Sequence, residues 1–284
     1  MTRKNIFEIL ASEYDINGEM KKIVKLFMQP MFAYTNPMNF QQSQLLNIEG
    51  IVDNFVLHDW KQRHGCLNCA EIRRKLKIGK HPNPQDDLIL TLEYFINLIR
   101  LAQNKAGLGQ NINFQYPKEY IMLLQNLQLI LEHLNYVEYI IQEEEKILLI
   151  PKDPAATAVA EISSKETAMA ILKYHHALLK GQLEEKRKLL LTIYQEYEPL
   201  FDKSSNEFTS YFTTVRGMIN NAHIRHNNKE GEDKKEAIAK MSDDELENLY
   251  DEIYQLLLFC VLAKNNRERK NKMAEFLKGL KEKK

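Results

Sequence analysis

The chain has 284 residues, 44% of them hydrophobic, which is enough for one large core or two smaller ones. Its 39 Lys and Arg residues balance 39 Asp and Glu residues, so no overall positive charge indicates nucleic-acid binding, and the local distribution must decide. The low Gly and Pro contents, 10 and 8, count against folds that need many tight turns.

Cysteine usage and hydropathy predict a cytoplasmic location. Three cysteines give no disulfide framework, which fits a reducing compartment. The segment MTRKNIFEIL at the N-terminus lacks the apolar core of a signal peptide. The strongest apolar run, Leu256 to Ala263, is too short to cross a bilayer. We therefore expect no membrane partner.

The first half of the chain predicts helices around one linker and one hairpin. Residues 1–80 form an expected N-terminal helical accessory module, with apolar residues at helical spacing over 6–10, 23–28 and 45–60. The segment 77–86, which contains Pro and Gly, predicts a linker. An acidic first turn and an apolar stripe predict a helix over 86–102, and a further helix is expected over 118–134. Two apolar segments with a polar centre predict a β-hairpin over 136–150.

A long helix is expected after the hairpin. Ser163 and Glu166 form a capping box that predicts a helix reaching about Tyr197, where Pro199 ends it. The next helix is expected over about 206–222.

A second capping box, Ser242 with Glu245, opens the closing helix, whose apolar stripe runs to Cys260. Together these elements predict an all-α fold: a helical bundle with a small β-hairpin insertion and an N-terminal helical module.

Residues 266–284 are expected to form a basic helix or tail, because nine basic residues and three Glu lie from Lys264 to Lys284. A solvated terminal helix and a surface that contacts phosphate or a partner both fit this charge.

The most informative pattern is a polar strip on the helix within EFTSYFTTVRGMINNAHIRH. At 100° per residue, Arg216, Asn220 and His223 fall within about 60° of one another, beside the apolar face. The planar guanidinium of Arg matches phosphate oxygens, and His can move a proton near neutral pH. These residues suit cleavage of a phosphodiester by the neighbouring ribose hydroxyl, with His as base or acid, and this chemistry needs no metal.

The spacing Arg216, six residues, His223, with a helix from Asp243 after it, resembles the signature of the HEPN superfamily of helical ribonucleases and toxins. The resemblance implies a HEPN-like domain over 86–265, in which the hairpin is an insertion. It also implies a metal-independent endoribonuclease, acting in phage defence or as a toxin, without a cofactor. The implied partners are RNA, a second copy of the chain that completes the active site, and an antitoxin or defence-system protein.

One position departs from the family pattern. The residue after the Arg is often polar in the family, whereas Gly217 follows Arg216 here. Asn220 or Asn221 would then supply the polar group, and Arg225 and His226 are secondary candidates for the site.

Two other interpretations stay open at this stage. The helical domain could be a catalytically silent interaction or scaffold subunit of a defence complex, in which the polar strip contacts a partner. A zinc site could also form from a group of potential ligands, namely His58, His64, Cys66 and Cys69. Their spacing is compressed and a second Cys pair is missing, so buried thiols and surface histidines are the preferred interpretation.

Overall fold

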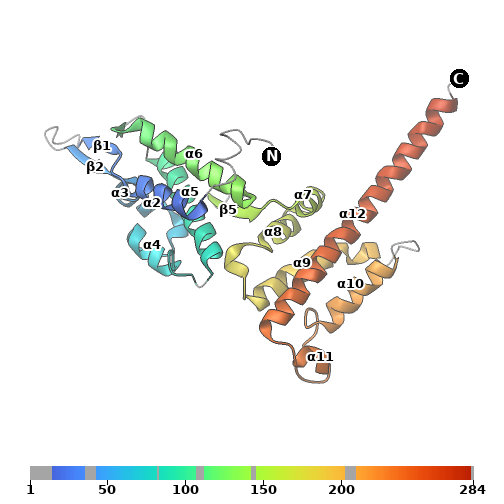
Figure 1. Cartoon of the computed structure of the whole chain (residues 1–284). Coiled ribbons are helices and arrows are strands. Elements are labelled where there is room, and N and C mark those ends of the chain that lie inside the picture. The colour runs from blue at the N-terminus through green and yellow to red at the C-terminus, as the bar shows by residue number, and fades with distance from the viewer. Residues whose placement is uncertain are drawn as a thin grey trace, which may run out of the picture. The chain divides into compact units, whose positions relative to one another are not determined.

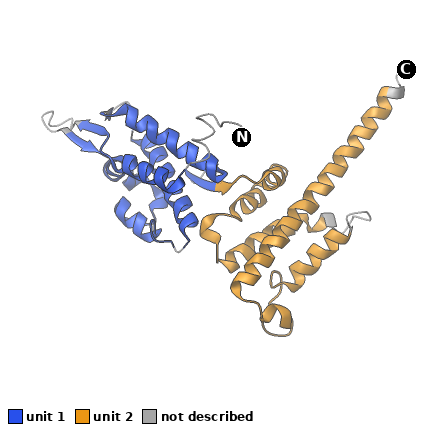
Figure 2. Ribbon diagram, in the orientation of Figure 1, with its two compact units in different colours: residues 1–149 blue, residues 150–284 orange. Residues whose placement is uncertain are grey.

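A computed structural model describes residues 15–35, 43–81, 83–106, 112–141, 145–201 and 209–282. The chain divides into two compact units, residues 1–149 and 150–284 (Figure 2). Both units are mostly helical, which confirms the expected all-α class in its coarse form. The expected helix at 6–10 lies outside the described residues.

In its described residues, unit 1 combines five α-helices with a small sheet and part of a hairpin (Figure 1). The helices are α2 (Ile16–Met28), α3 (Ile48–Phe55), α4 (Cys69–Lys75), α5 (Pro84–Lys105) and α6 (Pro117–Leu134). The sheet has the order β2-β1-β3, with β1 (Phe32–Thr35), β2 (Ser43–Leu46) and β3 (Asn113–Phe114). The hairpin consists of β4 (Tyr136–Ile141) and β5 (Lys146–Pro151), which confirms the prediction over 136–150.

Helix α5 is the centre of unit 1. Its start is encoded locally, because the Asn83 side chain accepts the backbone N–H of Gln85 at 2.9 Å and Pro84 occupies the first turn. Its Phe95 ring stacks on Phe27 of α2 with centroids 3.8 Å apart, and α5 also packs along α3. Residues 86–149 therefore belong to the same compact unit as the N-terminal helices. This division differs from the domain start expected at residue 86.

The three-stranded sheet was not foreseen from the sequence. Helical spacing over 45–60 predicted one helix, but residues 43–46 form β2 and α3 starts only at Ile48. Strand β1 pairs with β2 and also with β3, about 80 residues later in the chain. A short strand whose partner is that distant leaves no periodic signal in its own neighbourhood.

Unit 2 is a helical bundle. Its helices are α7 (Pro154–Ala160), α8 (Lys165–Lys173), α9 (Leu183–Phe201), α10 (Thr209–Asn221), α11 (Glu236–Ala239) and α12 (Asp243–Glu282). Its core contains fully buried tyrosines, and the rings of Tyr174 and Tyr254 stack with centroids 4.1 Å apart. A buried ion pair also joins α9 to α12: Nζ of Lys186 lies 2.8 Å from Glu247 and 2.8 Å from Asp251.

The prediction of one helix from Ser163 to about Tyr197 is wrong. Helix α8 ends at Lys173, and α9 begins only at Leu183, after Gly181 in the left-handed region with φ of +73°. The N-cap of α8 is Ser164, because its side chain, not that of Ser163, accepts the N–H of Thr167. Pro199 lies inside α9 instead of ending the helix.

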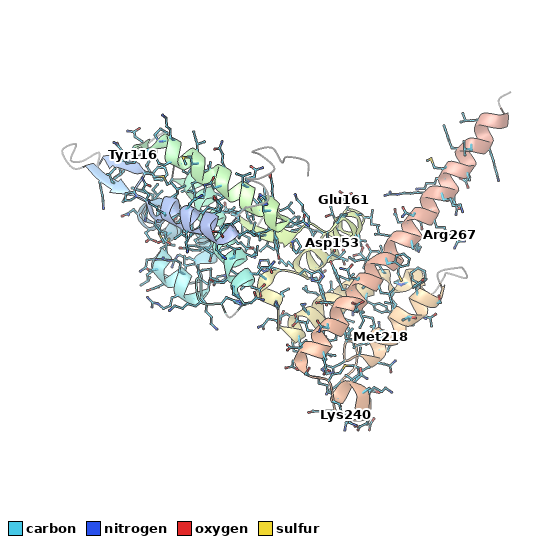
Figure 3. All side chains as sticks on the ribbon, in the orientation of Figure 1. Tyr116, Asp153, Glu161, Met218, Lys240 and Arg267 are labelled. Atoms are coloured by element: carbon cyan, nitrogen blue, oxygen red, sulfur yellow. The ribbon has the colours of Figure 1, made fainter. Side chains whose placement is uncertain are left out.

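Helix α12 begins at the predicted capping box. The backbone N–H of Ser242 donates to the Glu245 carboxylate at 2.8 Å, and the backbone N–H of Glu245 donates to the Ser242 hydroxyl at 3.3 Å. The helix then continues without a break into the expected basic tail, and residues 266–280 are all exposed. Figure 3 labels Arg267 on this exposed part. Within the described ranges, no helix is both long enough and apolar enough to span a bilayer.

The Asn97 amide of α5 helps to fix the hairpin, beside the Glu93 carboxylate that accepts the N–H of Leu149 at 2.7 Å. Asn97 accepts the N–H of Ile147 and donates to its carbonyl, each at 2.8 Å. The substitution Asn97→Ala removes both partners, so the free energy of unfolding should fall by about 2–4 kcal/mol in urea titrations. Asn104→Ala, at an exposed position of the same helix, should change it by less than about 0.5 kcal/mol. Equal effects of the two substitutions would contradict this role of Asn97.

Candidate active site at the end of helix α10

The chain turns sharply where the Arg–His strip was expected to continue. Helix α10 ends at Asn221, and His223 has a left-handed backbone with φ of +60°. The N–H of Arg225 then reaches back to the carbonyl of Ile219 at 2.9 Å. The expectation that Arg216, Asn220 and His223 share one helical face therefore fails for His223, because it lies in the turn beyond the helix.

A buried side chain, that of Asn228, holds this turn. Its Oδ1 accepts the backbone N–H of His223 at 2.8 Å, and its Nδ2 donates to the carbonyl of Asp233 at 2.9 Å. The Tyr250 hydroxyl of α12 donates to the carbonyl of His223 at 3.1 Å. Both backbone groups of His223 are therefore held, so the direction of its imidazole is fixed by the fold.

The two nitrogens of the His223 imidazole have different surroundings, and Nε2 is the one near Glu184. Nδ1 of His223 accepts the backbone N–H of Asn228 at 3.2 Å, so the neutral ring carries its proton on Nε2. Nε2 lies 4.0 Å from a carboxylate oxygen of Glu184 on α9. The His223 side chain is only 14% exposed, whereas that of Glu184 is 63% exposed, so the carboxylate marks the open side of the site.

Arg187 completes this cluster, which we call the His223 cluster (His223, Glu184, Arg187 and Asn228). Its Nη1 lies 3.1 Å from Glu184, and its Nε donates to the carbonyl of Ile224 at 2.9 Å. Burial lowers the pKa of His223, the positive charge of Arg187 lowers it further, and Glu184 partly opposes them. The ring is therefore neutral at pH 7 and lies between a guanidinium and a carboxylate.

Arg216 belongs to a different cluster. Burial raises the pKa of Tyr194, and hydrogen bonding by Arg216 partly offsets that rise. Glu198 forms an ion pair with Arg225 at 2.7 Å, and the Arg225 guanidinium lies 5.1 Å from the centre of the Tyr194 ring. The Arg225 hydrogen bond holds the pKa of Glu198 below its usual range, and the charge of Arg216 adds to this effect. Both arginines thus serve contacts inside the bundle.

The two clusters contact different stretches of α9. Seven residues separate Arg187 from Tyr194, which corresponds to about 10 Å along a helix. Of the predicted residues, Asn220 joins the Arg216 side, where its Oδ1 accepts from Arg225 at 3.4 Å. Arg187 therefore replaces Arg216 as the guanidinium beside the imidazole.

The secondary candidates take peripheral positions. Asn221 is exposed, and its amide donates to the carbonyl of Gly217 within α10 at 2.7 Å. His226 lies in the loop before α11, with Nδ1 3.9 Å from a carboxylate oxygen of Asp233. Neither contacts the His223 ring through an interaction seen in the described part of the chain.

The four potential zinc ligands do not converge. His58 forms an exposed pair with Asp59 at 3.0 Å, whereas the buried Cys69 thiol faces the carbonyl of Glu49 at 3.8 Å. Burial raises the pKa of Cys69 well above its usual range, which disfavours the thiolate that zinc binds. Within the described ranges, no three His, Cys, Asp or Glu side chains are placed to share a metal ion.

Sequence reasoning missed four residues of the His223 cluster and its support: Glu184, Arg187, Asn228 and Tyr250. Glu184 and Arg187 lie 36 or more residues before His223, and no spacing rule links them to it. Asn228 is 1% exposed although it lies in a polar loop. A buried Asn in a loop has no signature in a single sequence, because only the folded loop shows which backbone groups it satisfies.

The lowered pKa of His223 predicts a pH dependence of stability. Because the unfolded chain binds a proton that the folded chain resists, the free energy of unfolding should be constant above about pH 6.5 and fall as the pH drops toward about 5. Burial lowers the pKa of His175 in the same way. In urea titrations across this range, the free energy of unfolding should fall less with pH for His223→Gln than for His226→Gln. The second variant is the control, because His226 is a neighbouring exposed histidine. A loss that both variants retain in full would assign it to other groups.

Known proteins provide no assignment for this arrangement. Comparison with protein-family models, with curated proteins and with solved structures returned no match. The resemblance to the HEPN superfamily therefore stays a prediction from the sequence, and any function must be argued from the geometry of the site.

Proposed function

We propose that the protein is a metal-independent endoribonuclease whose reaction centre is the His223 cluster. The observation that carries the proposal is a largely buried imidazole, held by Asn228, with Nε2 4.0 Å from the exposed carboxylate of Glu184 and Arg187 beside both. A carboxylate, an imidazole and a guanidinium at one place supply a proton acceptor and two donors for a charged phosphate.

The proposed step is an internal phosphoryl transfer in RNA. Glu184 takes the proton of a ribose 2′-hydroxyl, and the 2′-oxygen bonds to the adjacent phosphorus while the bond from phosphorus to the 5′-oxygen breaks. Arg187 and the Nε2–H of His223 stabilise the negative charge on the pentavalent phosphorus. The 5′-oxygen takes a proton from solvent, and Glu184 returns its proton to solvent. The products are a 2′,3′-cyclic phosphate and a 5′-hydroxyl.

This assignment changes the roles of the residues expected from sequence. His223 acts as a hydrogen-bond donor, because Nδ1 already accepts from Asn228 and the proton therefore lies on Nε2. Arg216 and Asn220 support the bundle beside the site. A second copy of the chain, an antitoxin and a role in phage defence remain parts of the proposal that rest on the HEPN resemblance alone.

A second function is favoured by the same contacts. The ring of His223 accepts from Asn228, and Arg225 is paired with Glu198, so both side chains also serve to close the bundle. A catalytically silent interaction subunit would use these residues only for structure. The two functions differ at Glu184, whose exposed carboxylate lies 4.0 Å from Nε2 of His223 and forms no backbone hydrogen bond to the described residues of the turn that Asn228 holds.

The substitution Glu184→Gln separates the two functions. The Gln side chain keeps the shape but cannot accept a proton, so RNA cleavage in EDTA should fall about 10²–10⁴-fold while the thermal midpoint is nearly unchanged. The matched control is Glu185→Gln, because Glu185 is also exposed on α9 and pairs with Lys188 at 2.6 Å. Wild-type activity of Glu184→Gln, or no cleavage of any RNA by the wild type, would favour the silent subunit.

Separate replacement of Arg187 and Arg216 by Lys tests which guanidinium acts on the phosphate. Arg187→Lys keeps the charge but loses the planar fork, so the rate of cleavage should fall at least about tenfold. Arg216→Lys should mainly lower the thermal midpoint, because Arg216 contacts Tyr194 and Glu198. Product analysis should detect a cyclic phosphate with both variants. The opposite ranking of the two rates would return the catalytic role to Arg216.

A further inference from the structure

The C-terminal half of α12 carries an apolar stripe that no described part of the chain covers. Four large side chains on it are exposed to between 53% and 62%: Met273, Phe276, Leu277 and Leu280. Their spacing, i, i+3, i+4 and i+7, places them within about 100° of one another on the helix. Figures 1 and 3 show this part of α12 running past the ends of α9 and α10.

The charges around this stripe are strongly asymmetric. At 100° per residue, Arg269, Lys270 and Lys272 fall within about 90° of its centre, whereas Glu268 and Glu275 fall at least about 130° away. None of these three basic residues forms an ion pair with a described residue. The face that bears the apolar stripe is therefore basic only, and its occupant must be acidic.

A second apolar feature lies on the same side of α12. Phe259 is 44% exposed and falls in line with Leu277, 18 residues later at five turns of the helix. Its ring packs against Tyr211 of α10, itself 45% exposed, with centroids 5.3 Å apart. Apolar groups thus occur at both ends of a basic segment about 30 Å long.

We propose that this face of α12 binds the surface of an anionic lipid membrane, with the helix lying in the plane of the interface. A bilayer surface supplies both missing features, an apolar layer for the stripe and negative headgroups for Arg269, Lys270 and Lys272. This peripheral binding revises the expectation of no membrane partner, which considered only a span. It does not depend on the proposed RNA cleavage.

Other occupants fit the face less well. A second copy of this face would bring like charges together. RNA would satisfy the basic residues but leave the apolar stripe in water. A partner helix in a coiled coil needs three to four heptads, whereas Met273 to Leu280 spans little more than one, and Arg269 and Lys270 interrupt the repeat. A membrane surface needs no register and tolerates the interruption.

Vesicle co-sedimentation of the full chain tests the proposal. The protein should bind mixed phosphatidylcholine–phosphatidylserine vesicles, bind phosphatidylcholine vesicles at least about tenfold more weakly, and lose affinity as salt rises. The double substitution Phe276→Ser with Leu277→Ser keeps every charge and should lower binding at least about tenfold. The matched control is Ile121→Ser with Met122→Ser on α6, where both side chains are similarly exposed, at 53% and 51%.

Several outcomes would overturn the proposal. They are equal binding to neutral and anionic vesicles, or equal losses for the α12 and α6 double variants. Absence of vesicle binding, together with RNA binding that falls for Lys270→Gln with Lys272→Gln and not for the serine variant, would assign the face to nucleic acid. Absence of vesicle binding together with a dimer that the serine variant converts to a monomer would assign it to a second copy. Helical content measured by circular dichroism verifies that each variant is folded.

Discussion

The buried ion pair between Lys186 and two carboxylates of α12 sets the geometry on which the candidate site depends. Its ammonium group lies 2.8 Å from Glu247 and from Asp251, and the Lys186 side chain is only 5% exposed. A charge buried this deeply tolerates little rotation of α9, because moving it away from both carboxylates would leave it unpaired. The neighbours of Lys186 in sequence, Glu184 and Arg187, are thereby directed toward His223. Tyr250, between the two carboxylates in sequence, holds the carbonyl of His223.

Helix α9 carries the proposed catalytic residues and the structural ion pair at different positions along its length. The first turns of α9 carry Glu184 and Arg187 beside an imidazole with a lowered pKa. Eleven residues after Arg187, about 16 Å further along the helix, Glu198 is paired with Arg225. The Glu198 carboxylate is paired with Arg225, whereas the Glu184 carboxylate is mostly exposed. A group that is to exchange protons with a substrate needs this exposure, and a group that only supports the fold does not.

Helix α12 changes character along its length. Up to Val261 most of its apolar residues complete the core of unit 2, with Phe259 an exposed exception. Beyond residue 265 every apolar side chain that the structure describes faces solvent. Charged residues dominate the sequence of the exposed part, and the four large apolar residues among them form a stripe only when the segment is helical. Continuity of the helix converts those residues into a single face with the acidic residues on the far side.

The sequence by itself determined the elements whose signals lie within a few residues of each other. The capping box of Ser242 and Glu245 was predicted, because the cap bonds to its own next turn. The start of α5 at Pro84 has an equally local cause in the Asn83 cap, although the sequence predicted a linker through residue 86. The tertiary structure alone decided the rest. His223 leaves the helical face because the side chain of Asn228, five residues later, captures its backbone, and Arg187 approaches it because α9 folds back along α10. Helical periodicity describes neighbours three or four residues apart, so it could place Arg216 beside Asn220. It could not select the guanidinium that packing brings to the imidazole.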